Sequence, residues 1–289
     1  MLSTPTASPP TRWPWPPLLR ASVGVHAAAL GAAALLPGAA PWALGAVVLN
    51  HVLITATGLW PRSEGLGPNV QRLPPAAVAR GAIAVTIDDG PDAETTPLVL
   101  DTLAALGWHA SFFCIAERAR QQPALVRRIV AAGHDVQNHS AHHRHHFSVM
   151  GPRALEREVG DAQSILADIT GCRPHAFRAP AGLRNPFLDP VLHGLGLHLV
   201  SWTRRGFDTR EADPARVLAR LARGLAGGDI LLLHDGHAAR AAGGRAVLLD
   251  VLPALLAHCR ERGLTPVTLS SVVMSRCGRH RAAAVHRSR

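Results

Sequence analysis

The 289-residue chain contains no lysine and no tyrosine, and aromatic residues make up only 4% of it. All 30 basic residues are therefore arginines, and with 20 acidic residues the formal net charge is +10. Apolar residues make up 47% of the chain, which excludes disorder of the whole chain. The length suits one large domain with an appendage, or two small domains.

Acidic residues are missing from both ends of the chain. Glu64 is the only acid before Asp88, and none follows Glu261, although six arginines do. A basic chain is typical of nucleic-acid binding, but a groove that binds nucleic acid usually carries its charge on a folded face. Because the charge lies at the two ends and lysine is absent, we expect compositional bias and no nucleic-acid partner.

Cysteine is scarce and histidine is abundant. The four cysteines lie far apart and form no Cys-x-x-Cys pair, which argues against a cysteine zinc site. Of the 17 histidines, six fall between His134 and His146. This local excess is the first indication of chemistry in the chain.

Charged residues are absent between positions 21 and 60. The preceding residues 1–20 are rich in proline, serine and threonine and are expected to form a disordered or interfacial lead-in. The apolar stretch breaks at Pro37 and Pro41, and each half alone is marginal for the roughly 20 residues that span a bilayer. Together the halves predict a membrane-embedded helical hairpin over residues 21–60, with Trp42 and Trp60 at opposite interfaces.

Two other interpretations of this stretch stay open. Residues 21–36 resemble the apolar region of a cleaved signal peptide, although Pro41 would be unfavourable just after the cleavage site. Alternatively, the halves are two ordinary buried helices. For a membrane hairpin, the positive-inside rule favours a cytoplasmic main domain, since arginines flank it on both sides and its turn has none, whereas a single uncleaved span would place that domain outside.

The rest of the chain alternates apolar runs with amphipathic segments. A linker is expected over residues 61–80, a folded domain over 81–272 and an arginine-rich tail over 273–289. Strands are predicted over 82–87, 110–115, 134–137, 175–178, 197–202, 230–233 and 266–269, and helices over 97–106, 125–132, 153–169, 214–225 and 246–262. This alternation predicts an α/β parallel sheet or barrel with functional residues at the carboxyl ends of its strands.

Two adjacent carboxylates, Asp88 and Asp89, end the first predicted strand in the sequence Thr-Ile-Asp-Asp-Gly-Pro. Two ionised carboxylates cannot share an apolar cleft without a cation or strong hydrogen-bond donors. A metal ion beside one of them would meet this need, whereas an acidic turn or helix cap is the plainer explanation.

Five histidines lie within residues 139–146. His139 and His143 are four residues apart, so one helical turn would place both imidazoles on the same side. Two imidazoles and one carboxylate are a typical ligand set for zinc or a similar metal. His142 and His146 have the same spacing, so spacing does not choose between the pairs, and an adventitious metal-binding patch stays open.

Polar residues also follow three later strands. Arg178, in Phe-Arg-Ala-Pro-Ala-Gly, could hold a carboxylate by bidentate pairing, and a backbone N–H just after Pro180 could face a developing oxyanion. Asp208 could pair with Arg178 or orient a histidine. His234 ends an apolar strand, where a histidine is suited to general acid catalysis near neutral pH. Each of these motifs by itself also fits a plain loop.

The order and context of the five motifs resemble those of the polysaccharide deacetylase superfamily, carbohydrate esterase family four. The resemblance extends from about residue 82 to residue 269, and the combination of motifs is far more specific than any one of them. It implies an α/β fold, a distorted (β/α) barrel of about seven strands, here preceded by the N-terminal apolar helical hairpin.

The resemblance implies a metal centre and a base. Asp88 matches the general base of the family. Asp89, His139 and His143 match the ligands of one divalent metal ion, with Zn²⁺ as the first choice, although such a set accommodates several metals.

The resemblance also implies the remaining roles. Arg178 matches the arginine that holds the base, His234 the general acid, and Asp208 the acid that tunes this histidine. Leu232 matches the apolar wall that receives the acyl methyl group, and the backbone N–H of Ala181 matches the oxyanion donor.

Two positions depart from the family pattern. The family usually has an aromatic residue at the position of Ala181, so a side-chain wall of the sugar site is missing while the N–H remains. Near Asp208, an arginine and a threonine, Arg205 and Thr209, stand where an acid and a tryptophan are expected. These departures affect sugar binding more than the hydrolytic residues.

The implied activity is that of a hydrolase of carbon–nitrogen bonds other than peptide bonds. It would remove an N-acyl group, first of all N-acetyl, from an amino sugar of a polysaccharide, an oligosaccharide or a lipid-linked glycan. A membrane hairpin over residues 21–60 would favour a glycolipid substrate, and a deformylase of a lipid-linked formamido sugar would use the same residues. A hypothesis of another class is a non-catalytic, membrane-anchored, arginine-rich protein that binds anionic lipid or nucleic acid.

Overall fold

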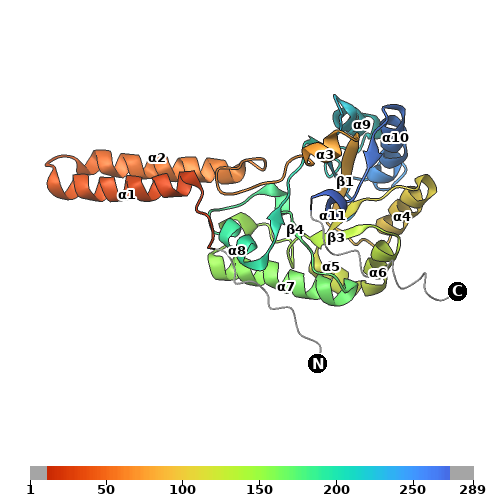
Figure 1. Cartoon of the computed structure of the whole chain (residues 1–289), viewed down its shortest axis with the longest axis horizontal. Helices are drawn as coiled ribbons and strands as arrows, with labels where there is room; N and C mark the ends of the chain where they lie inside the picture. Colours follow the sequence, from red (N-terminus) through yellow and green to blue (C-terminus); the bar gives the residue numbers. More distant parts are fainter. Residues whose placement is uncertain (1–11, 274–289) are drawn as a thin grey trace.

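A parallel sheet of seven strands forms the centre of the molecule in the computed structural model, which describes residues 12–273 (Figure 1). The strand order is β5-β4-β3-β2-β1-β7-β6, and a short β8 pairs beside β1. The strands are β1 (Ala82–Asp88), β2 (Ser111–Cys114), β3 (Asp135–Asn138), β4 (Ala176–Phe177), β5 (His198–Leu199), β6 (Arg204–Arg205), β7 (Ile230–His234) and β8 (Thr265–Pro266). The predicted distorted (β/α) barrel is confirmed.

The two longest strands, β1 and β7, are neighbours in the sheet, and most of their side chains are apolar on both faces. Every residue of β1 and of β7 is buried, as is usual for parallel strands covered by helices on one side and barrel interior on the other. The parallel ladder places Asp88 at the end of β1 beside His234 at the end of β7. Both predicted catalytic side chains therefore leave the same edge of the sheet.

Helices cover the outer face of the sheet (Figure 1). Helix α7 shows why, because its apolar stripe of Leu155, Val159, Ala162 and Leu166 is fully buried while its other face is polar. The helices of this domain are α3 (Pro75–Val78), α4 (Thr95–Leu106), α5 (Ala116–Gln121), α6 (Pro123–Ala131), α7 (Pro152–Thr170), α8 (Leu188–Leu195), α9 (Pro214–Ala222), α10 (Val247–Glu261) and α11 (Leu269–Val272).

Several short elements differ from the sequence prediction. Helices α5 and α8 and strand β6 were not predicted, because they are too short for a periodic pattern and β6 consists of two arginines. The strand expected over 197–202 shrinks to His198–Leu199, and the one expected over 266–269 shrinks to Thr265–Pro266, after which Leu269 begins α11. The first and last parts of the chain, residues 1–11 of the expected lead-in and 274–289 of the expected tail, lie outside the described residues.

The segment expected as a linker over 61–80 packs on the domain. Leu66 and Leu73 in it are buried. Val70 forms a parallel bridge with Val200, just after β5, and the N–H of Leu73 donates to the carbonyl of Gly228, just before β7. This segment therefore lies between the β5 edge and the start of β7.

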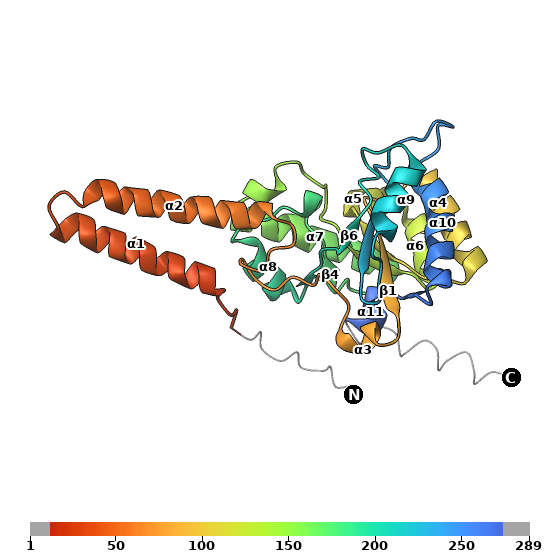
Figure 2. The ribbon, with the colours of Figure 1, turned by 90° about the horizontal axis from the view of Figure 1, so that it is seen from above.

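Helices α1 (Pro17–Leu35) and α2 (Ala40–Leu59) form an antiparallel hairpin that projects away from the domain (Figures 1 and 2). Both are long and apolar enough to cross a membrane. Of the most apolar 18 residues, only 6% are buried in α1 and only 17% in α2. The amide of Asn50 donates to the hydroxyl of Ser22 at 2.8 Å, and the imidazoles of His26 and His51 approach to 3.2 Å. Such polar contacts hold two apolar helices together.

The base of the hairpin is tied to the domain by hydrogen bonds. The indole of Trp13 donates to Asp189 at 2.7 Å, and the N–H of Arg184 donates to the carbonyl of Gly58 at 3.1 Å. The hydroxyl of Ser201 donates to the carbonyl of Pro61 at 2.6 Å. These hydrogen bonds therefore fix the position of the base of the hairpin on the domain.

We expect Gly58→Ala to weaken this attachment. A Cβ at position 58 would lie 2.2 Å from the carbonyl oxygen of Arg184, and a backbone atom cannot move aside at little cost. The substitution should lower the free energy of unfolding by about 1–3 kcal/mol, measured by thermal unfolding of the full chain in detergent.

Gly45→Ala on the same helix is the matched control, because no heavy atom lies within 4 Å of its Cβ position. This variant should be neutral or more stable by roughly 0.5–1 kcal/mol, since alanine favours helix over glycine. Equal unfolding temperatures for the two variants would contradict the proposed contact.

Candidate active site

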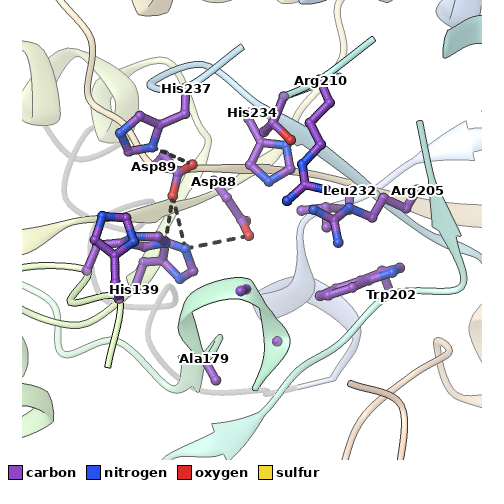
Figure 3. A pocket seen from close by; sticks show the side chains of 15 residues that line it. Asp88, Asp89, His139, Ala179, Trp202, Arg205, Arg210, Leu232, His234 and His237 are labelled. Atoms are coloured by element: carbon purple, nitrogen blue, oxygen red, sulfur yellow. Dashed lines mark hydrogen bonds and ion pairs between the residues drawn. The ribbon is translucent and has the colours of Figure 1, made fainter. Parts of the chain in front are cut away.

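A pocket of about 280 Å³ opens at the carboxyl ends of the strands (Figure 3). Seven of the nine predicted site residues line it: Asp88, Asp89, His139, His143, Ala181, Leu232 and His234. The other two, Arg178 and Asp208, lie directly behind and contact lining residues. The structure therefore brings all nine together.

Asp88 is held by a buried arginine. The Nη1 of Arg178 donates to Oδ1 of Asp88 at 2.6 Å and to the hydroxyl of Thr86 at 2.7 Å. Nε and Nη2 of this guanidinium donate to the carbonyls of Val200 and Ser201, and its centre lies 4.1 Å from the ring centroid of Phe113. One oxygen of Asp88 is thus fixed, and Oδ2 lies 3.8 Å from Nε2 of His139.

Asp89, His139 and His143 present lone-pair atoms to one another. Oδ1 of Asp89 lies 3.2 Å from Nε2 of His139 and 3.3 Å from Nε2 of His143. This oxygen is buried and has no hydrogen-bond partner within the described part of the chain. Nδ1 of His139 must donate to the carbonyl of Arg178 at 2.8 Å, which leaves Nε2 as the lone-pair atom of the neutral ring.

The charges of the site fit a divalent cation. Burial alone would raise the pKa of Asp89, but the imidazoles of His139 and His237 hold it well below its ordinary range. Burial and the neighbouring His139 lower the pKa of His143 to about 4, so this ring is neutral at physiological pH. One carboxylate and two imidazoles, whose ligand atoms lie within 4.8 Å of one another, are a donor set that suits zinc and related metals.

The way in which the two histidines meet corrects the sequence prediction. They do not lie on a helical turn, since residues 139–143 form a loop in which Ser140 and His143 have φ of 67° and 52°. The hydroxyl of Ser140 accepts the N–H of His143 at 3.0 Å and closes the turn. His142 instead points to Glu158, at 3.0 Å, so the alternative pair of His142 and His146 does not face Asp89.

His234 is oriented by Asp208 through both carboxylate oxygens. Oδ1 of Asp208 accepts Nδ1–H of His234 at 2.9 Å, and Oδ2 accepts its backbone N–H at 2.7 Å. Of the two partners considered for Asp208, the structure therefore selects the histidine rather than Arg178. Burial lowers the pKa of His234, but the hydrogen bond and charge of Asp208, with the charges of Asp88 and Asp89, raise it above its ordinary value.

Sequence reasoning missed His237, which follows His234 by three residues. Its Nε2 accepts Nη2–H of Arg118 at 2.9 Å, so its Nδ1 carries the proton and donates to Oδ2 of Asp89 at 2.8 Å. Arg118 also donates to the carbonyl of Asp89. The extra histidine in Leu-His-Asp-Gly-His was the available signal, and its effect is to turn the other oxygen of Asp89 toward His139 and His143.

Arg210 and Trp202 also line the pocket and were not predicted. Arg205, noted in the sequence as a departure, lines it beside them. Figure 3 shows these three side chains on the side of His234, with His139 on the opposite side. No sequence pattern indicated Arg210, because it lies in a loop two residues after Asp208.

Comparisons with known proteins agree on one family. The family model of polysaccharide deacetylase matches residues 76–200. A peptidoglycan-N-acetylglucosamine deacetylase of Bacillus cereus is 30% identical over 193 residues, which cover 66% of this chain and 87% of that protein. A chitooligosaccharide deacetylase of Sinorhizobium fredii is 32% identical over 168 residues, which cover 58% of this chain and 78% of that protein. A solved family 4 carbohydrate esterase from Streptomyces lividans, in complex with acetate, has 30% identity and a TM-score of 0.60 over 66% of this chain and 93% of its own.

We expect His237→Ala to weaken metal binding while leaving all three ligands in place. Without the hydrogen bond at Oδ2, the carboxylate of Asp89 is free to rotate away from the two imidazoles. Partners of this kind are typically worth about 10–100-fold in metal affinity, so Kd for Zn²⁺ should rise by that factor. Competition with a chromophoric chelator on the full chain measures it.

His146→Ala is the control, because this exposed histidine belongs to the alternative pair and does not line the pocket. Its Kd for Zn²⁺ should match that of the unaltered chain. A His237→Ala variant that binds as tightly as the control would show that His237 does not position Asp89.

Proposed function

The chain belongs to the polysaccharide deacetylase family, and we propose that the pocket at the strand ends is its active site. Membership makes the chain a carbohydrate N-deacetylase, a hydrolase of carbon–nitrogen bonds in N-acetylated amino sugars. The complete set of residues in the pocket favours an enzyme over the non-catalytic binding protein. The observation that carries the assignment is one pocket lined by a fixed carboxylate, an Asp-His-His set and a carboxylate-oriented histidine.

Asp89, His139 and His143 would hold a divalent cation, with Zn²⁺ as the first choice. Bound there, the cation supplies Lewis acidity toward the acyl oxygen and the attacking water. Further support is the orphaned buried oxygen of Asp89, which lies between two imidazole nitrogens.

Asp88 acts as the general base that takes a proton from the attacking water. Arg178 occupies Oδ1 of Asp88, so proton transfer falls to Oδ2, which is turned toward His139. The guanidinium also balances the negative charge of the base, which would otherwise be buried beside that of Asp89.

His234 acts as the general acid on the departing amine. Asp208 accepts the hydrogen bond from Nδ1–H, so Nε2 is the nitrogen that faces the substrate. Two neighbours complete the acyl site in this proposal: the N–H of Ala181 donates to the oxyanion, and Leu232 contacts the acyl methyl group.

The hairpin of α1 and α2 would attach the enzyme to a membrane. Leucines and a tryptophan along it are 65–83% exposed, namely Leu30, Leu35, Trp42, Leu44 and Leu49. An apolar surface of this extent is unusual on a protein that meets only water. Because arginines flank the hairpin at both ends, the positive-inside rule favours a cytoplasmic catalytic domain, which would act on a glycolipid at the membrane surface.

Asp88→Asn and His234→Ala should each lower kcat by about 10²–10⁴-fold, because each removes one proton-transfer group. Amine release from N-acetylglucosamine oligomers or from a lipid-linked N-acetyl amino sugar measures this. Chelation of divalent metals should abolish release from the unaltered protein, and Zn²⁺ should restore it.

Glu94→Gln is the control, since it removes a carboxylate that is 76% exposed on the same loop. Turnover by this variant should stay within about twofold of the unaltered protein, as is typical of surface substitutions. Near-normal turnover by Asp88→Asn or His234→Ala, with unfolding temperatures unchanged, would rule out the assigned roles.

Asp208→Asn should change the pH profile as well as the rate. The general acid must be protonated, so kcat falls as pH rises through the raised pKa of His234. Without the charge of Asp208 that pKa drops, and the alkaline fall of kcat moves to lower pH. An alkaline limb that stays in place, recorded over pH 5–9, would show that Asp208 has only a structural role.

A further inference from the structure

Two arginines enter the active-site pocket without a carboxylate partner. Arg205 and Arg210 line the pocket on the side of His234, across Asp88 from His139 (Figure 3). Neither takes part in an ion pair with any residue between 12 and 273. Unpaired cationic side chains beside a reaction centre indicate that the substrate carries an anionic group there.

The two arginines of β6 point to opposite faces of the strand, and only Arg205 faces the pocket. Arg204 turns outward, where its guanidinium donates to Asp229 at 2.9 Å and to two backbone carbonyls. Arg205 turns to the opposite face, and its buried Nε has no hydrogen-bond partner in the described chain. Its guanidinium lies 5.4 Å from the ring centroid of Trp202 and 5.0 Å from that of Phe207, so the two rings hold it in place.

The acids around Arg205 and Arg210 each have another partner, since Asp88 pairs with Arg178 and Asp89 accepts a hydrogen bond from His237. Both oxygens of Asp208 accept hydrogen bonds from His234. Glu211 pairs with Arg220 at 3.1 Å, outside the pocket. The positive charges of Arg205 and Arg210 are therefore left for a ligand.

A second cavity lies beside this part of the pocket, at the base of the hairpin. It has a volume of about 340 Å³ and shares Trp202 and Arg205 with the active site; its lining is Trp60, Pro61, Arg62, Trp202, Thr203, Arg205 and Phe207. Arg62 at its far end also has no ion-pair partner among residues 12–273. Pro61 lies against Gly182, next to the proposed oxyanion donor, where a Cβ would meet it at 2.7 Å.

We propose that the substrate carries a phosphate group beside the N-acylated sugar, and that Arg205 and Arg210 bind this phosphate. The inference rests on the proposed function, because it places the amide at Asp88 and His234. Phosphate suits the site better than a single carboxylate, since it offers several acceptor oxygens to two planar guanidinium groups. The phosphate belongs either to a soluble sugar phosphate or to a lipid-linked sugar, whose chain would then run through the second cavity toward α2.

Binding is measured first, on the full chain in detergent with His234→Ala to prevent turnover. The probes are N-acetylglucosamine 1-phosphate and the uncharged methyl glycoside of N-acetylglucosamine, by calorimetry. The phosphate sugar should bind more tightly, and Arg205→Gln with Arg210→Gln should weaken it by about 10–100-fold, the usual range for charge-assisted hydrogen bonds. Binding of the glycoside should change less than about threefold.

Arg216→Gln is the charge-matched control, because this exposed arginine on α9 pairs with Asp213 at 3.3 Å and does not line the pocket. It should leave both affinities unchanged. Equal affinity of the parent for the two probes, or a phosphate preference that survives loss of both pocket arginines, would overturn the inference.

Amine release then separates the two proposals and the two sources of phosphate. With His234 restored, faster release from a polyprenyl-diphosphate-linked N-acetylglucosamine in micelles than from the sugar phosphate supports a lipid source, and the reverse supports a soluble one. Arginine-dependent phosphate binding without amine release from any substrate would refute the proposed function but uphold this inference. Amine release without any preference for phosphate would uphold the proposed function and refute this inference.

Discussion

The structure depends on one buried ion pair, between Arg178 and Asp88. Arg178 is 1% exposed and is the largest fully buried side chain in the described part of the chain. Burying a guanidinium is costly unless its donors are satisfied, and here they reach Asp88, Thr86 and two carbonyls at the end of the sheet. Because these groups come from β1 and from the segment after β5, the pair fixes the strand ends and the proposed base together.

Each other group of the site is likewise held by a partner behind it. The carbonyl of Arg178 sets the tautomer of His139, Asp208 sets that of His234, and His237 orients Asp89. Rigid support of this kind places lone pairs and protons before substrate arrives, so less reorganisation is needed during reaction.

The many arginines, which first suggested binding to nucleic acid, have several different physical roles. Arg204 stabilises the fold through Asp229, and Arg178 supports the base. Arg205 and Arg210 bring unpaired charge to the pocket beside a hairpin base that opens onto it. Neighbouring positions of a two-residue strand thus serve stability and substrate binding separately, because successive side chains point to opposite faces.

Periodicity and apolar runs along the chain were enough to predict the alternation of strands and helices, the apolar hairpin helices and the strand-end positions of Asp88 and His234. The structure added the way in which His139 and His143 reach Asp89, since left-handed residues in a loop, and not a helical turn, bring them together. It also showed that Asp208 contacts His234 through both carboxylate oxygens, and that His237 and Arg210 join the pocket. Those contacts depend on how loops from separate strand ends converge, which spacing along the chain does not encode.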